Sequence, residues 1–208
     1  MKKLVYLISP NKIYKNFYVD LKKVLAANKV AFFQLRLKKM SENKIIKIGK
    51  KIKKITRQYN VKLIVNDSFK IAKKINADGC HLGQLDGNIP KTKQYFKNKI
   101  IGSTCHNSRK IAKMSIKNKV DYVAFGSFYK SKLKPNAKKA KLKVLKWAKK
   151  NIKKPVVAIG GINDKNYKKL IHAGANYIAI SSFIWDNPIL KPEQAIKKFK
   201  NENISKRN

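Results

Sequence analysis

Two carboxylates in this chain stand at positions where a metal ion could bind. The 208 residues include only ten Asp and Glu against 51 Lys and Arg, so the place of each acid is informative. Asp67 and Asp86 come shortly after two neighbouring apolar runs, and Asn66 and Gln84 lie beside them. Carboxylate and amide oxygens suit a hard cation such as Mg2+. Capping of the helix that follows is the alternative for each aspartate.

Two cations follow another apolar run, residues 30–35. Arg36 and Lys38 are two positions apart, so both side chains can point to the same side as Gln34. A solvated charge is a strong alternative for Lys38, one of 47 lysines, and a weaker one for Arg36, one of four arginines. Cations beside two Mg2+ ligands indicate a pyrophosphate site.

A second anion site is indicated near the end of the chain. Gly160 and Gly161 follow an apolar run, and Ser181 and Ser182 follow the next one. Glycines allow backbone N–H groups to approach a phosphate, and a helix N-terminus adds a favourable dipole. A plain glycine turn is the alternative.

The elements that must position these residues are eight short apolar runs with helical patterns between them. Near-continuous hydrophobicity is typical of parallel strands that are covered on both faces. Eight strands alternating with helices predict a single (β/α)8 TIM barrel, with its active site at the carboxyl ends of the strands. The predicted strands are residues 4–8, 30–35, 61–65, 79–82, 100–102, 122–125, 155–159 and 177–180.

The domain organisation follows from the same pattern. We expect one catalytic domain over residues 1–200 and a polar C-terminal tail over residues 201–208. A doubly wound open sheet is the alternative fold, but no Gly-x-Gly-x-x-Gly follows the first apolar run. Residues 103–106 are expected to lie beyond the fifth strand.

The net charge of +41 invites a nucleic-acid function. The lysines are spread along the whole chain, however, and arginine, which bidentate phosphate and base recognition favours, is scarce. Lys, Asn and Ile share A- and T-rich codons, so a biased genome accounts for the excess. We therefore expect no nucleic-acid partner. Since no apolar run approaches 18 residues, we also expect no membrane partner and a cytoplasmic location.

Six motifs in order carry a family resemblance. Together they resemble the family shared by thiamine-phosphate synthases and thiazole tautomerases, over nearly the whole chain. The motifs are Gln34-Leu35-Arg36-x-Lys38, Val65-Asn66-Asp67, His81-Leu82-Gly83-Gln84-x-Asp86, Ile101-Gly102-x-Thr104-x-His106, Tyr122-Val123-Ala124-Phe125-Gly126-Ser127-Phe128 and Ala158-Ile159-Gly160-Gly161-Ile162.

The resemblance implies a TIM-barrel transferase of thiamine biosynthesis. Such an enzyme joins 4-amino-2-methyl-5-hydroxymethylpyrimidine diphosphate to a thiazole phosphate (carboxylate) and releases pyrophosphate. The reaction is dissociative: the bond from the pyrimidine methylene to oxygen breaks, and the thiazole nitrogen captures the resulting cation. The enzyme must therefore hold the leaving pyrophosphate with Mg2+, and it requires little acid–base chemistry.

Carried over to this chain, the resemblance also implies residue roles. The implied catalytic residues are Arg36, Lys38, Thr104 and Lys134. The pyrimidine diphosphate site comprises Gln34, Arg36, Lys38, Asn66, Thr104 and Lys134. The thiazole phosphate site comprises Ser131, Lys132, Leu133, Gly161, Ser181 and Ser182. The Mg2+ ligands, one ion per active site, are Asp67 and Asp86.

Two positions depart from the family pattern. Leu133 replaces the second Thr of a Thr-x-Thr loop and removes one hydrogen bond to phosphate, while Lys130 and Lys132 add cations nearby. Leu85 replaces an acid beside Asp86 and leaves less negative charge near the metal.

Two other functions remain as alternatives. A thiazole tautomerase would use His106 as its acid–base residue, but it needs no pair like Asp67 and Asp86. A non-catalytic basic barrel that binds phosphate or RNA would not need Arg36 and these two acids. His81 is expected to be structural, and a homo-oligomeric state is left open.

Overall fold

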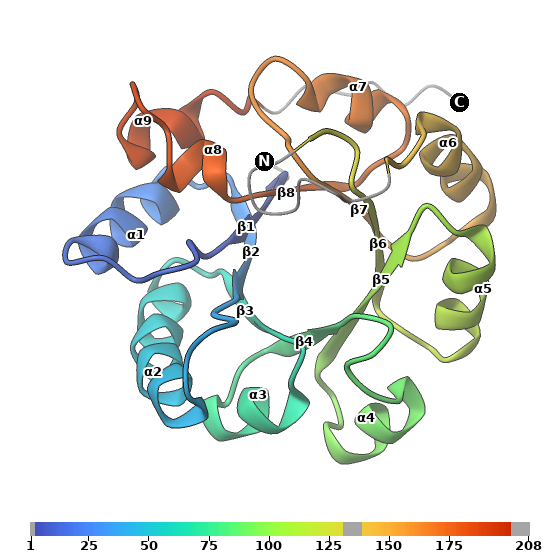
Figure 1. Cartoon of the computed structure of the whole chain (residues 1–208), viewed down its shortest axis with the longest axis horizontal. Coiled ribbons are helices and arrows are strands. Elements are labelled where there is room, and N and C mark those ends of the chain that lie inside the picture. Colours follow the sequence, from blue (N-terminus) through green and yellow to red (C-terminus); the bar gives the residue numbers. More distant parts are fainter. Residues whose placement is uncertain (1–2, 131–138, 201–208) are drawn as a thin grey trace.

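Eight parallel strands close into a barrel in the order in which they follow one another along the chain (Figure 1). The computed structural model describes residues 3–130 and 139–200. The strands are β1 (Val5–Ile8), β2 (Val30–Leu35), β3 (Lys62–Asn66), β4 (Gly79–Leu82), β5 (Ile100–His106), β6 (Tyr122–Gly126), β7 (Val156–Ile159) and β8 (Tyr177–Ile180). The predicted (β/α)8 barrel is therefore confirmed.

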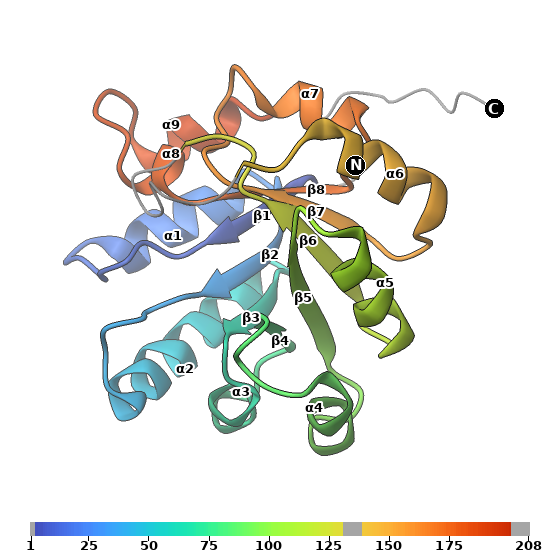
Figure 2. The ribbon, with the colours of Figure 1, turned by 45° about the vertical axis from the view of Figure 1, so that its right-hand side comes forward.

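The helices form a ring around the outside of the strands (Figures 1 and 2). They are α1 (Phe17–Ala26), α2 (Glu42–Gln58), α3 (Phe69–Ile75), α4 (Ile89–Tyr95), α5 (Arg109–Lys117), α6 (Leu142–Asn151), α7 (Tyr167–His172), α8 (Ser182–Trp185) and α9 (Pro192–Lys197). In the part of the chain that the structure describes, no helix is both long enough and apolar enough to cross a membrane.

Alternation along each strand divides the buried side chains into two clusters. Outward-facing residues such as Val5 and Leu7 pack under the helices, in the larger cluster. Inward-facing residues fill the barrel interior: Tyr6, Ile8, Ile64, Tyr122, Ala124, Val157 and Ala179. The alternation follows from the period of two in a strand, and the filled interior leaves room for substrates only at its ends.

Gly102 packs tightly against a tyrosine ring in the barrel interior. A Cβ atom at this position would overlap the ring and hydroxyl of Tyr122, on the neighbouring strand β6. Tyr122 is 3% exposed, so its ring has no free space to move into. The glycine on β5 therefore makes it possible for a tyrosine to lie across the middle of the barrel.

The exit of β5 differs from the sequence expectation. Residues 103–106, which we placed beyond the fifth strand, continue it to His106. The pairing of β5 with β6 is irregular between Thr104 and His106, and His106 has a φ of 50°. A bulge of this kind adds a residue and re-aims side chains at a barrel rim. Thr104 comes before the irregularity and points into the barrel, where its Oγ1 lies 2.8 Å from Nε2 of His81. The domain limits, 1–200 and 201–208, stay predictions.

Candidate active site at the barrel mouth

The carboxyl ends of the strands, called the mouth here, bring Asp67 and Asp86 together from the exits of β3 and β4. Neither aspartate caps a helix, because Ser68 caps α3 and Asn88 caps α4 with side-chain hydrogen bonds. Asp67 has a φ of 65°, a left-handed conformation that few residue types tolerate. The capping alternative is therefore wrong for both acids.

The two carboxyl groups lie within hydrogen-bonding reach of each other. Burial, and then the side chain and charge of Asp86, raise the pKa of Asp67 to about 6. The N–H of Gly83 donates to Oδ2 of Asp86 at 2.8 Å, and a Cβ on Gly83 would lie 2.5 Å from that oxygen. The turn after β4 thus holds the Asp86 carboxylate against a second acid, a placement that is unfavourable until a cation neutralises it.

Two cations partly offset this concentration of negative charge. Nζ of Lys38 lies 3.6 Å from Oδ2 of Asp67, and both Lys38 and Arg36 lower the pKa of that carboxyl. Burial lowers the pKa of the Arg36 guanidinium, and Asp67 opposes this effect. Arg36 and Lys38 therefore lie at the mouth with the acids, as the spacing predicted.

Ser9 fixes the backbone from which Arg36 projects. Its Oγ accepts a hydrogen bond from the Arg36 N–H at 2.9 Å and donates to the Arg36 carbonyl at 3.3 Å. The Ser9 side chain, at the exit of β1, is 2% exposed. This serine was not identified from the sequence, because a hydroxyl after an apolar run carries no signal of which backbone it will bind.

Gln34 on β2 and Thr104 on β5 lie three strands apart in the barrel and are joined by three other side chains. Nε2 of Gln34 donates to the Tyr6 hydroxyl at 3.0 Å, which lies 2.7 Å from the Tyr122 hydroxyl. Nδ1 of His81 lies 2.9 Å from that hydroxyl, and its Nε2 lies 2.8 Å from Oγ1 of Thr104. The sequence analysis missed Tyr6 and Tyr122, although alternation places both inside the barrel.

The glycines after β7 pack against the loop that leaves β6. Gly160 and Gly161 have φ values of 106° and 60°, so side chains would be strained at both positions. A Cβ on Gly161 would overlap the carbonyl of Lys130, the last described residue before the predicted phosphate loop. Ser131, Lys132, Leu133 and Lys134 lie outside the described residues.

The serines after β8 lie at the same end of the barrel. Oγ of Ser181 donates to the carbonyl of Ser9 at 3.1 Å, and Ser182 begins the short helix α8. Ser9 thus links the exits of β1, β2 and β8. The mouth therefore contains the described members of both predicted phosphate sites, with the acids on the β3–β4 side and Gly161 on the β7 side.

The remaining candidates occupy simpler surroundings. Asn66 is the last residue of β3 and is half-buried, and Gln84 donates to the carbonyl of Thr104 at 2.5 Å. His106 is exposed at the end of β5. Leu85, beside Asp86, is 99% exposed.

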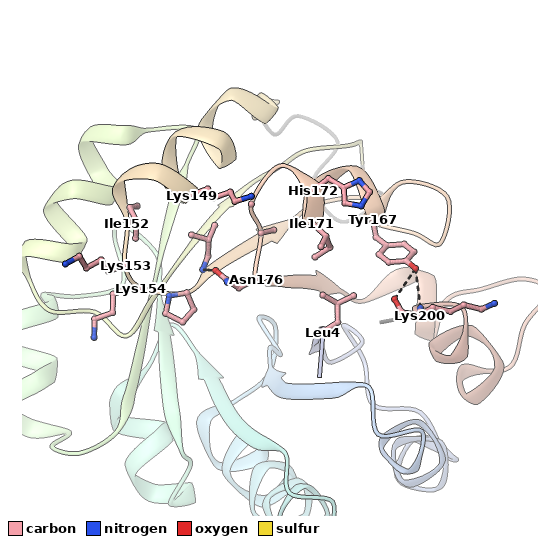
Figure 3. A pocket seen from close by; sticks show the side chains of 14 residues that line it. Leu4, Lys149, Ile152, Lys153, Lys154, Tyr167, Ile171, His172, Asn176 and Lys200 are labelled. Atoms are coloured by element: carbon pink, nitrogen blue, oxygen red, sulfur yellow. Dashed lines mark hydrogen bonds between the residues drawn. The ribbon is translucent and has the colours of Figure 1, made fainter. Parts of the chain in front are cut away.

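A cavity of about 360 Å³ lies at the opposite end of the barrel. Figure 3 shows the residues that line it, which include Lys149, Lys153, Lys154, His172 and Asn176. None of the predicted site residues is among them. The carboxyl ends of the strands, rather than this cavity, therefore carry the candidate chemistry.

Comparisons with known proteins show which family the whole chain resembles. Residues 5–184 match the family described as thiamine monophosphate synthase. The chain is 56% identical over 201 residues to the thiamine-phosphate synthase of Pelagibacter ubique, covering 96% of this chain and 97% of that one. It is 33% identical over 202 residues to that of Methanobrevibacter smithii, covering 96% of each chain. The solved thiamine phosphate pyrophosphorylase from Pyrococcus furiosus superimposes with a TM-score of 0.84 at 27% identity, over 95% of this chain and 93% of that one.

Proposed function

We propose the function of the mouth from one premise: the chain belongs to the thiamine monophosphate synthase family. It is a thiamine-phosphate synthase, an enzyme of thiamine biosynthesis. The substrates are 4-amino-2-methyl-5-hydroxymethylpyrimidine diphosphate and a thiazole phosphate, with or without its carboxylate. The observation that carries the proposal is the facing pair Asp67 and Asp86 beside Arg36 and Lys38.

The residues at the mouth fit a divalent cation. Two carboxylates face each other, and burial, followed by the neighbouring Asp86 carboxyl, raises the pKa of Asp67 even though Lys38 and Arg36 lower it. Within residues 3–130 and 139–200 no third His, Cys, Asp or Glu joins them, which suits Mg2+, since this ion commonly takes one or two carboxylates plus substrate phosphates. Asp67 and Asp86 would hold the ion, which when bound neutralises charge on the diphosphate.

The chain's own cations act on the same leaving group. Arg36 and Lys38, together with Lys134, bind the diphosphate and stabilise the negative charge that grows on it as the carbon–oxygen bond breaks. Gln34, Asn66 and Thr104 orient the pyrimidine, so that the methylene faces the incoming thiazole nitrogen. No residue has to remove a proton in this step.

The second substrate enters from the β7–β8 side. Gly161, Ser181 and Ser182 bind the thiazole phosphate together with Ser131, Lys132 and Leu133. The close approach of the Gly161 backbone to the loop after β6 supports this grouping. The cytoplasmic location and a homo-oligomeric state stay predictions.

A coupling assay with both thiazole phosphate forms, with and without Mg2+, tests the proposal. We expect Mg2+-dependent formation of thiamine phosphate and its loss in Asp67→Asn and Asp86→Asn. Glu42→Gln is a matched control, because this exposed acid pairs with Lys74 on the helical ring. Turnover that survives both aspartate substitutions would contradict the metal site. Steeply salt-dependent RNA binding without turnover would contradict the enzyme.

A further inference from the structure

Five polar side chains form one continuous line of hydrogen bonds across the barrel interior. The line runs from Gln34 on β2 through Tyr6 on β1, Tyr122 on β6 and His81 on β4 to Thr104 on β5. Each of its four donor–acceptor distances lies between 2.7 and 3.0 Å. The line thus joins two residues of the proposed pyrimidine site through three residues that have no assigned role.

The side chains of this line are buried in the barrel core, where apolar side chains could fill the same space. Tyr6, Gln34, Tyr122 and His81 are 2%, 4%, 3% and 8% exposed. The His81 ring stacks on that of Tyr122, with ring centroids 5.5 Å apart. Burying polar groups is unfavourable unless every group finds a partner. A complete polar chain in a barrel core therefore points to a role beyond packing.

Counting hydrogens gives the chain a direction. Because Gln34 donates to the Tyr6 hydroxyl, the Tyr6 hydrogen needs another acceptor, and the Tyr122 oxygen lies at 2.7 Å. The Tyr122 hydrogen then goes to Nδ1 of His81. In neutral histidine the other nitrogen carries the proton, so Nε2–H donates to Oγ1 of Thr104. Reversal at any one link would leave a buried hydrogen without an acceptor, at a cost of about 1–3 kcal/mol.

This direction decides what the two ends offer to the mouth. The Thr104 oxygen accepts from His81, so its own hydrogen is free to donate to a ligand. At the other end, Gln34 uses its amide nitrogen on Tyr6 and keeps Oε1 as an acceptor.

We propose that Tyr6, Tyr122 and His81 are positioning residues that hold Thr104 as a hydrogen-bond donor and Gln34 as an acceptor for the aminopyrimidine ring. The inference rests on the proposed function, since an aminopyrimidine has ring nitrogens that accept and an amino group that donates. Through these three buried residues, the donor role of Thr104 and the acceptor role of Gln34 depend on each other. If the donors and acceptors of the ring were exchanged, a ring donor would face the Thr104 donor and a ring acceptor would face the Gln34 acceptor.

The direction of the chain can be measured without substrate. Nitrogen-15 NMR of the histidine side chains distinguishes the two neutral tautomers of His81. We expect the Nε2–H tautomer in the wild-type protein, with Nδ1 as the acceptor, and a changed Nδ1 signal in Tyr122→Phe. An Nδ1–H tautomer in the wild-type protein would overturn the proposal.

Steady-state kinetics test whether the chain positions the substrate. We expect Tyr122→Phe to raise KM for the pyrimidine diphosphate about tenfold or more, with KM for the thiazole phosphate changed less than twofold. Tyr177→Phe is the matched control, because its ring also packs in the barrel interior, against Phe32, but lies outside the chain. Changes of less than twofold in both KM values for Tyr122→Phe would overturn the proposal.

A pair of His81 variants separates positioning from folding. His81→Gln keeps one donor and one acceptor, whereas His81→Leu keeps neither, so we expect the first to retain more of the affinity for the pyrimidine diphosphate. Equal kinetics of the two variants, with thermal unfolding confirming that both fold, would overturn the proposal. A wild-type protein without coupling activity would overturn the proposed function and the substrate named here, whereas an active wild type with unchanged variants overturns the positioning chain alone.

Discussion

The two ends of the barrel use the same residue types, Asp and Lys, in opposite ways. At the amino ends of the strands, called the foot here, Asp78 accepts from the N–H of Leu63 at 2.7 Å and from Lys53 at 2.6 Å. Asp121 is held in the same manner by Lys93 and a backbone N–H, at 2.8 Å each. Oδ2 of each foot carboxylate thus accepts from one lysine and one backbone N–H.

The mouth leaves its carboxylates short of partners. Among the described residues, the cation that pairs with Asp67 is Lys38, at 3.6 Å, and burial together with the neighbouring carboxyl of Asp86 raises the pKa of Asp67. The foot also contains the 360 Å³ cavity, and several lysines line it. Lysines are common throughout this chain. The contrast teaches that neither cavity volume nor lysine density locates the function. The functional site is instead indicated by acidic side chains whose negative charge the fold does not fully neutralise.

Removing one carboxylate at each end should give the largest contrast in activity. We predict that Asp86→Asn lowers kcat/KM by at least about 100-fold, which corresponds to roughly 3 kcal/mol of transition-state stabilisation. Asp121→Asn should keep kcat/KM within about threefold, since its amide oxygen can still accept from the Ile101 N–H. The coupling assay on the purified variants measures both values of kcat/KM. Equal losses of kcat/KM in the two variants would contradict the difference between mouth and foot.

The arginine at the mouth should have the next largest effect. Arg36→Met keeps a long apolar stem and removes the charge, so we predict a loss of about 100-fold in kcat with a smaller change in KM for the thiazole phosphate. Arg57→Met, on helix α2, is the matched control. An Arg36→Met enzyme with wild-type kcat would show that the guanidinium does not act on the leaving group.

Stability should respond with opposite signs at the two ends. The pKa of Asp67 is raised to about 6, so the folded protein binds more protons than the unfolded chain, and stability falls as the pH rises toward 6. At pH 7.5 without metal, Asp67→Asn should therefore stabilise by roughly 1 kcal/mol after solvent screening is allowed for. Asp121→Asn should destabilise by about 1–3 kcal/mol. Urea unfolding measures both, and the same sign at both ends would contradict the comparison.

The lysines of the foot cavity should have the smallest effect. We predict that Lys153→Gln combined with Lys154→Gln changes kcat/KM less than twofold at about 0.15 M ionic strength, where exposed charges are screened beyond ~8 Å. In the wild type, KM for both phosphorylated substrates should rise with salt, because the overall positive field attracts them. A large loss of activity in the double variant would move the functional site toward the foot.

The fold could be predicted from the sequence because its strands are short, apolar and evenly spaced. Predicted and observed strands agree at β2, β4 and β8, and elsewhere their ends differ by no more than one residue except at the end of β5. The exit of β5 was wrong because the polar run 103–106 does not look like a strand, although its partners on β4 and β6 continue the ladder.

The site was predictable in its members but not in their connections. Scarcity identified Arg36, Asp67 and Asp86, and the order of strands brought them together. Ser68 and Asn88, both favoured N-cap residue types, take the capping roles that the sequence analysis had left open to the aspartates. The chain through Tyr6, Tyr122 and His81 joins strands far apart in sequence, and it depends on the space that Gly102 leaves.

Pyrophosphate binding provides the sharpest test of the mouth as a site for a divalent cation and a diphosphate. Calorimetric titration of the wild type and of Asp67→Asn combined with Asp86→Asn would measure Kd with and without Mg2+. We predict that Mg2+ tightens pyrophosphate binding at least about tenfold in the wild type and has no such effect in the double variant. Equal tightening by Mg2+ in both proteins would contradict the assignment of Asp67 and Asp86.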